Sequence, residues 1–141
     1  MLEEERGYSL IELMLAITVI GLLAAVAAPK VSHVLAVSRS QKVAADLQML
    51  DAAVVMYEVE HGSLPKGKDI GELKDYVEQI DSVRPPAGSA VIVNGTQTSL
   101  AAEEYELTKG VGTMRATWNG KYAEAFLPSR GSAAAPAPKG D

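Results

Sequence analysis

The chain has 141 residues, enough for one modest domain and one additional element. Its net charge of −5 argues against a basic surface that would bind nucleic acid along the whole chain. The absence of cysteine excludes disulfides, thiolate metal sites and a cysteine nucleophile, and two histidines leave few candidates for a general base.

A membrane-length apolar run begins the chain. Tyr8 to Ala28 is 21 residues, and a helix of that length covers about 30 Å, the thickness of one hydrocarbon core. Glu12 interrupts this run, and a charge within a span costs about 3 kcal/mol unless it has a partner. A cleaved secretory signal is disfavoured because the core is too long and "MLEEERG" precedes it, and a buried core helix would need a larger protein around it. Length and composition therefore leave two interpretations of the apolar segment: a plain membrane anchor, or a segment with a more specific role.

The local sequence carries a further signal. "GYSLIELMLAITVIGLLAAVAAP" (7–29) resembles the N-terminus of the type IV pilin superfamily, which includes the pseudopilins of type II secretion. The resemblance implies that a prepilin peptidase cuts between Gly7 and Tyr8 and that the new N-terminus at Tyr8 is methylated. Tyr8 replaces the family's usual phenylalanine. The other matching positions are Ser9, Leu10, Ile11, the family's glutamate at Glu12, and the helix-loosening Gly21 and Pro29.

The resemblance also implies a partner for the Glu12 carboxylate. Cleavage would give Tyr8 a free α-amine four residues away on the same helical face. Glu12 would pair with this amine in its own chain or in a neighbouring subunit, and the pair would fix register more than add stability. The leader departs from the usual basic pattern, with three glutamates against Arg6. Either the secretion machinery sets the orientation despite this charge, or the chain starts upstream of Met1.

The apolar run continues into an amphipathic segment. Val43, Leu47, Leu50, Val54 and Tyr57 have helical spacing, which predicts one helix over about residues 8–60, bent or loosened at Gly21 and Pro29. Its outer half would pack on a small domain, while its bare inner half would need a bilayer or copies of itself. The polar interruptions are Arg39, Lys42, Asp46, Asp51 and Glu58.

Turn signals and alternation predict the elements after the helix. Gly62 is expected to cap the long helix, and residues 69–80 to form a short helix that starts at a box made by Asp69 and Glu72. Strands are expected around 89–93, 103–108 and 113–118, with turns at 94–95, 109–112 and 119–120 and a return strand over 122–127. Trp118 and Tyr122 are expected to pack across the last hairpin.

The predicted fold class is α+β and type IV pilin-like: a long N-terminal helix with a small antiparallel sheet of three or four strands. We expect a leader at 1–7, a transmembrane and assembly helix at 8–29, the second helix half with the soluble head at 30–128, and a disordered tail rich in alanine, proline and glycine at 129–141.

The chemistry-bearing residues favour a structural role over an enzyme. Glu58 and His61 share a helical face, with Glu60 beside them, but a solvated helix terminus explains them better than a metal site. No catalytic residue, metal site or cofactor is expected.

The predicted function is therefore a filament subunit, stored in the bacterial inner membrane as a single-pass precursor and later placed in a surface or periplasmic filament. Its expected partners are the membrane, the prepilin peptidase, copies of itself, minor pilins or pseudopilins and an assembly platform protein. The alternatives are a major pseudopilin of type II secretion, a subunit whose head binds a ligand, and a membrane-anchored domain that does not assemble.

Overall fold

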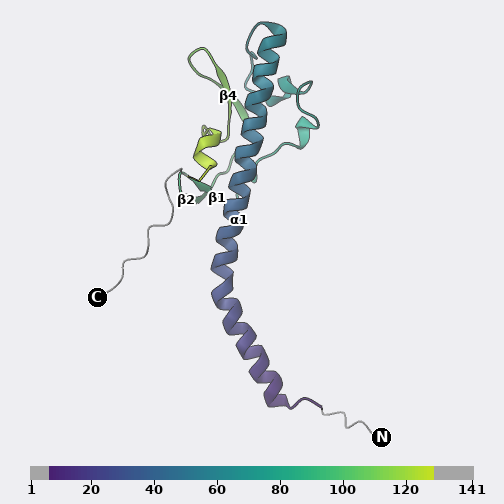
Figure 1. Ribbon diagram of the computed structural model, residues 1–141, viewed down its shortest axis with the longest axis vertical. Helices are drawn as coiled ribbons and strands as arrows, with labels where there is room; N and C mark the ends of the chain where they lie inside the picture. Colours follow the sequence, from purple (N-terminus) through teal and green to yellow (C-terminus); the bar gives the residue numbers. More distant parts are fainter. Residues whose placement is uncertain (1–6, 129–141) are drawn as a thin grey trace, which may run out of the picture. The chain divides into compact units, whose positions relative to one another are not determined.

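The computed structural model describes residues 7–128 and divides into two units at Val34 and Leu35. A long helix, α1 (Leu10–His61), contributes residues to both units (Figure 1). We call residues 10–34 of α1 the stem and residues 35–128 the head. The head's other elements are η1 (Ile70–Leu73), η2 (Ile80–Ser82), β1 (Ala90–Val93), β2 (Thr96–Ser99), β3 (Glu106–Lys109), β4 (Met114–Thr117) and η3 (Ala123–Phe126). A long helix with antiparallel β-structure is the α+β layout that the sequence predicts.

The head's part of α1 buries the apolar stripe that helical spacing predicts. Val43, Leu47, Leu50 and Val54 are at most 2% exposed, and Tyr57 packs against the same core. The helix ends as expected, because Gly62 adopts a φ of +66°, which glycine tolerates without a Cβ clash, and its N–H donates to the Glu58 carbonyl. The buried stripe thus fixes which face of α1 the head covers.

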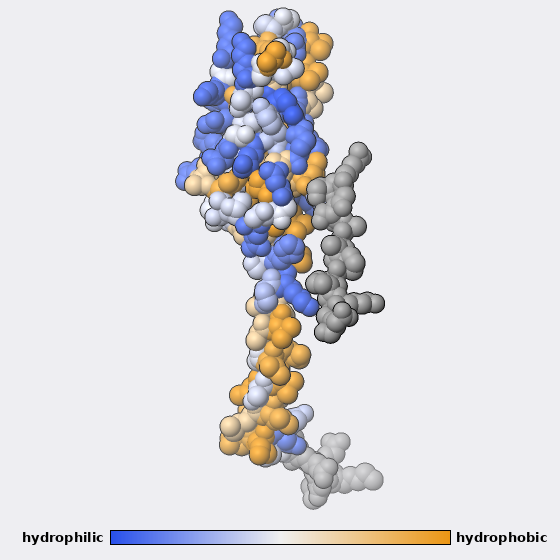
Figure 2. Space-filling model, turned by 90° about the vertical axis from the view of Figure 1, so that its left-hand side faces the viewer, coloured by the Kyte–Doolittle hydropathy of each residue, from blue (hydrophilic) through white to orange (hydrophobic). Residues whose placement is uncertain are grey.

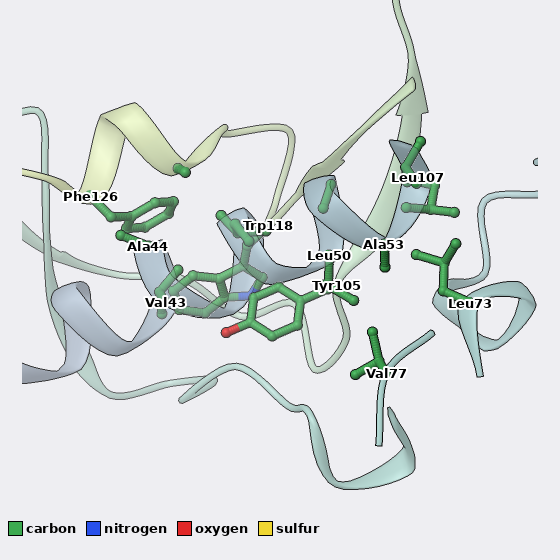
Figure 3. Close-up of a cluster of buried hydrophobic side chains, with 14 of the residues drawn as sticks. Val43, Ala44, Leu50, Ala53, Leu73, Val77, Tyr105, Leu107, Trp118 and Phe126 are labelled. Carbon is green, nitrogen blue, oxygen red and sulfur yellow. The ribbon is translucent and has the colours of Figure 1, made fainter. Parts of the chain in front are cut away.

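Aromatic side chains fill the centre of this core. Trp118 is fully buried, donates its indole N–H to the Ala102 carbonyl at 2.8 Å and stacks on Phe126 with ring centroids 5.6 Å apart (Figure 3). The expected packing pair of Trp118 and Tyr122 is wrong. The Tyr122 ring instead lies under the Arg115 guanidinium at 4.8 Å, a cation–π contact outside the core.

Polar side chains of α1 bind the backbone of the head directly. The Asp51 carboxylate accepts the Ala116 N–H of β4 at 2.6 Å and two N–H groups of Arg115 at 3.0 and 3.1 Å. The buried Ser40 hydroxyl accepts the Ile92 N–H of β1 at 2.6 Å and donates to the Ala36 carbonyl. Asp51, which the sequence suggests is only a polar interruption, therefore anchors a strand to the helix.

The strands form two separate two-stranded antiparallel sheets, β1–β2 and β3–β4. The expected turns at Asn94-Gly95 and Asn119-Gly120 are present, with positive φ at all four residues. The expectation of one sheet with three or four strands is wrong, because each strand has only four residues and pairs with one partner.

The predicted return strand over 122–127 is also wrong. After the Trp118–Lys121 bridge, residues Ala123–Phe126 form η3, with the Ala125 N–H bonded to the Tyr122 carbonyl. The Ala125 carbonyl accepts the Asn94 N–H at 2.7 Å, which ties η3 to the β1–β2 turn. Burial of Phe126 against Trp118 and this bond together favour a compact turn over a further strand.

The predicted helix over 69–80 is two short 3-10 turns, η1 and η2. Asp69 caps η1 as expected, but the Glu72 carboxylate binds the N–H groups of Lys66 and Gly67 instead of completing the box. Gln79 has a φ of +55°, which interrupts helical geometry before η2. The predicted apolar face is nevertheless confirmed, since Leu73, Val77 and Ile80 are buried and Ile70 packs beside them.

The Asp51 anchor yields a stability prediction. Replacing Asp51 with alanine leaves the Ala116 N–H and the Arg115 guanidinium without their acceptor, so the free energy of unfolding should fall by about 1–3 kcal/mol. Glu124→Ala removes only the exposed partner of the same arginine and should cost less than about 1 kcal/mol. Urea unfolding of the detergent-solubilised protein measures both, and equal losses would contradict the anchoring role of Asp51.

Candidate processing and assembly site

The predicted cleavage position precedes the helix. Gly7, Tyr8 and Ser9 have no regular secondary structure, and α1 begins at Leu10. Tyr8 is 92% exposed, and no atom outside the neighbouring residues lies within 4 Å of a Cβ placed on Gly7. The bond between Gly7 and Tyr8 therefore lies in accessible chain outside the helix, where a peptidase can reach it. Cleavage after Gly7 and methylation of Tyr8 stay predictions.

Glu12 caps the start of the helix. Its carboxylate accepts the Ser9 backbone N–H at 2.9 Å, which is one half of a capping box with Ser9 at the N-cap and Glu12 at the third helical position. The negative charge also lies in the first turn, where the helix macrodipole favours it. Within residues 7–128 Glu12 takes part in no salt bridge, and its stabilising partners in that part of the chain are the Ser9 amide and the helix dipole.

The stem exposes its apolar side chains on every side. All residues from 7 to 35 are exposed, among them Leu10 at 77% and Leu22 at 70%. The Thr18 hydroxyl donates to the Met14 carbonyl at 2.7 Å, so even this polar group is satisfied within the helix. α1 is the one described helix long and apolar enough to cross a membrane, and hydrophobic residues dominate the view of the stem in Figure 2.

Gly21 and Pro29 do not interrupt α1. The helix continues through both residues, so neither of them ends it. Pro29 has no N–H for the preceding turn, which removes one backbone bond without ending the helix. A Cβ placed on Gly21 would have no atom within 4 Å, so this glycine leaves a shallow gap in the stem surface. Nothing in residues 7–128 occupies this gap, which leaves Gly21 available for close contact with another helix.

At the C-terminal end of α1, aromatic side chains and the Glu60 carboxylate form a cluster. His61 stacks on Tyr57 with ring centroids 4.2 Å apart, and the Tyr76 hydroxyl donates to the Glu60 carboxylate and lies 3.3 Å from His61 Nδ1. In residues 7–128 no three His, Asp or Glu side chains lie together as metal ligands would. The cluster therefore joins the helix end to the loop that carries Tyr76.

Comparison with known proteins concerns the N-terminal segment. A family model for the prokaryotic N-terminal methylation motif matches residues 4–28. This motif is the prepilin signature of type IV pilins and pseudopilins, and the match confirms the resemblance drawn from residues 7–29. No curated protein and no solved structure matches the chain.

The Tyr76 cluster generates a prediction about alkaline pH. The hydrogen bond to Glu60 is the main cause that raises the pKa of Tyr76 from 10.0 to about 12. Because the neutral phenol is favoured in the folded protein, its contribution to stability is present below pH 10 and is lost as pH rises through about 12. Ultraviolet titration of tyrosinate in Glu60→Gln should show one tyrosine ionising earlier than in the wild type. Identical titration curves would contradict the contact.

Proposed function

We propose that the chain, which carries the prokaryotic N-terminal methylation motif, is a precursor of the type IV pilin and pseudopilin kind and the structural subunit of a type IV pilus-like filament. The precursor is held in the inner membrane by the stem, is cleaved after Gly7 by a prepilin peptidase, is methylated at Tyr8 and polymerises through α1. The proposed domain limits are a leader at 1–7, an assembly helix at 8–29, the second half of the helix with the soluble domain at 30–128, and a tail at 129–141. Leader residues 1–6 and the tail lie outside the described residues.

One observation carries this proposal: the apolar stem is uncovered. None of the apolar side chains of residues 10–34 is buried, although folding ordinarily removes such side chains from water. A bilayer covers the stem in the precursor, and other stems cover it after cleavage. The accessible Gly7–Tyr8 bond and the capped helix start at Glu12 support processing at one end of this same segment.

Several finer statements belong to the same proposal. We favour a pilus over the pseudopilus of type II secretion, which is the second candidate because the matched motif is common to both. The expected partners are the peptidase, further copies of the chain, minor subunits and an assembly platform protein. The mature filament is expected at the cell surface or in the periplasm. The head acts as a structural cover for the helix and not as an enzyme, and its role needs neither a cofactor nor nucleic acid.

The N-terminus of the mature protein tests the processing step. Mass spectrometry of the protein isolated from membranes should show a chain that starts at Tyr8 and carries one added methyl group. The Gly7→Val variant should keep its leader, because the peptidase would meet a stiff branched side chain beside the bond it cuts. A wild-type chain that retains residues 1–7 would leave a membrane-anchored domain as the better description.

The role of Glu12 is tested by two variants that separate its charge from its capping bond. Glu12→Ala removes both, whereas Glu12→Gln keeps an oxygen that accepts the Ser9 N–H but loses the charge. We expect both precursors to be cleaved and both to reduce sheared filaments by about tenfold or more, because the α-amine of Tyr8 would lack its partner in an apolar surrounding.

The Glu12→Gln variant decides between the two roles. If Glu12→Gln assembles at the wild-type level while Glu12→Ala does not, the side-chain oxygen that accepts the Ser9 N–H is what assembly needs, and the hypothesis of charge pairing is wrong. Immunoblots of the sheared fraction and of the membrane fraction give both amounts from one culture.

A further inference from the structure

Each strand of the two small sheets has one edge that its partner strand does not cover. Three of these four edges are bonded to other parts of the head. Ser40 of α1 accepts a strand N–H of β1, and Asp51 of α1 accepts one of β4. The Leu107 N–H of β3 donates to the Lys68 carbonyl at 2.7 Å. The remaining edge belongs to β2, which is separated from α1 by β1 (Figure 1).

The register of β1 and β2 shows which main-chain groups of β2 point outward. Ile92 faces Gln97, and the Ile92 N–H points away from β2 because Ser40 accepts it. In an antiparallel pair, facing residues either exchange both of their hydrogen bonds or direct both outward, and the two kinds of pair alternate. The N–H and C=O groups of Gln97 and of Ser99, two residues later, therefore point away from β1. Within residues 7–128 these outward groups make no hydrogen bond.

The sequence of β2 lacks the features that usually protect a free edge. Proteins place lysine, proline or a bulge at such edges, which prevents pairing with another strand. Thr96–Ser99 has no charged residue and no proline, its four residues are all exposed, and it pairs with β1 without a bulge. No charged residue lies between Arg84 and Glu103, in a chain with a net charge of −5. Two copies of the chain can therefore meet at this edge without facing like charges.

The free edge of β2 is complementary to the same edge of a second copy. When the second β2 is rotated by half a turn about a point beside Thr98, Gln97 of each copy faces Ser99 of the other. The outward N–H and C=O of each residue then bond the C=O and N–H of the residue that it faces. The two Thr98 residues face each other between these bonded pairs, and opposed threonines are a favourable cross-strand pair. The two hairpins then form one antiparallel sheet in the order β1–β2–β2–β1, which is larger than a marginally stable two-stranded sheet.

We propose that the free edge of β2 binds the same edge of a second copy of the chain, antiparallel and centred on Thr98. Both copies use the same surface, so the contact is isologous and joins two heads without continuing to a third. It differs in this respect from a contact that extends a filament. The inference therefore does not rest on the proposed filament function.

Disulfide trapping tests the register, because the sequence has no cysteine. The full chain with Thr98→Cys, solubilised in detergent and mildly oxidised, should give a covalent dimer on a non-reducing gel. Facing residues of this kind have Cα atoms about 4.5 Å apart, which is within disulfide reach.

The matched control is Thr96→Cys. Thr96 is also an exposed threonine and lies on the same face of β2 as Thr98. In the proposed register, however, Thr96 lies about 14 Å from its copy, too far for a disulfide. We therefore expect about tenfold more dimer from Thr98→Cys than from Thr96→Cys.

A second pair of variants tests whether main-chain bonds hold the two edges together. In the Thr98→Cys chain, Gln97→Pro removes an outward N–H and should lower the dimer yield by about tenfold, whereas Gln97→Ala keeps the N–H and should leave the yield unchanged. Proline is tolerated at an edge where its nitrogen faces solvent, so the β1–β2 pair should remain. Thermal unfolding of the reduced proteins, which should be the same for both variants, checks this.

The outcomes decide the proposal without involving the filament. Equal dimer yields from Thr98→Cys and Thr96→Cys would overturn it, as would an unchanged yield in the Gln97→Pro variant. The absence of dimer from both cysteine variants would also overturn it, and is the result expected if another segment or another protein occupies the edge. None of these results bears on cleavage after Gly7 or on polymerisation through α1.

Discussion

The uncovered apolar stem is the constraint from which the rest of the molecule follows. A helix with leucine, isoleucine and valine around its whole circumference cannot remain in water, and the head buries none of these side chains before Ala36. The chain therefore depends on an external apolar phase, either lipid or other helices. Under the proposed function, the surface that requires lipid before cleavage would be covered by copies of the chain afterwards.

The head solves the opposite problem, since it must hold a small β-structure against one side of a helix that continues past it. Two sheets of two strands each are too small to be stable alone. Direct bonds from α1 to strand amides compensate for this, through Ser40 to β1 and Asp51 to β4. Tyr105 adds a third link by donating to Asp46, and burial together with this carboxylate raises the pKa of Tyr105. The helix thus supplies both the apolar core and the polar anchors of its own cover.

The residues proposed for assembly and those that serve folding share α1 but occupy different segments of it. Glu12 and Gly21 lie in the stem, whereas Leu47 and Asp51 face the head's core and strands. Substitutions in one set need not disturb the other. The separation follows from the length of α1, whose 52 residues include both an exposed apolar segment and a segment packed on the head's core.

The sequence by itself determined the local features of this protein. Periodicity placed the helix, its buried stripe and its end at Gly62, and asparagine–glycine pairs placed two turns, because these depend on interactions between residues close in the chain. The methylation motif was also readable, since order and spacing over 25 residues define it. Only the tertiary structure decided that the strands form two sheets, that 123–126 is a 3-10 turn, and that Trp118 stacks on Phe126. These features depend on contacts between distant residues, such as the bond from Asn94 to Ala125, which no local pattern encodes.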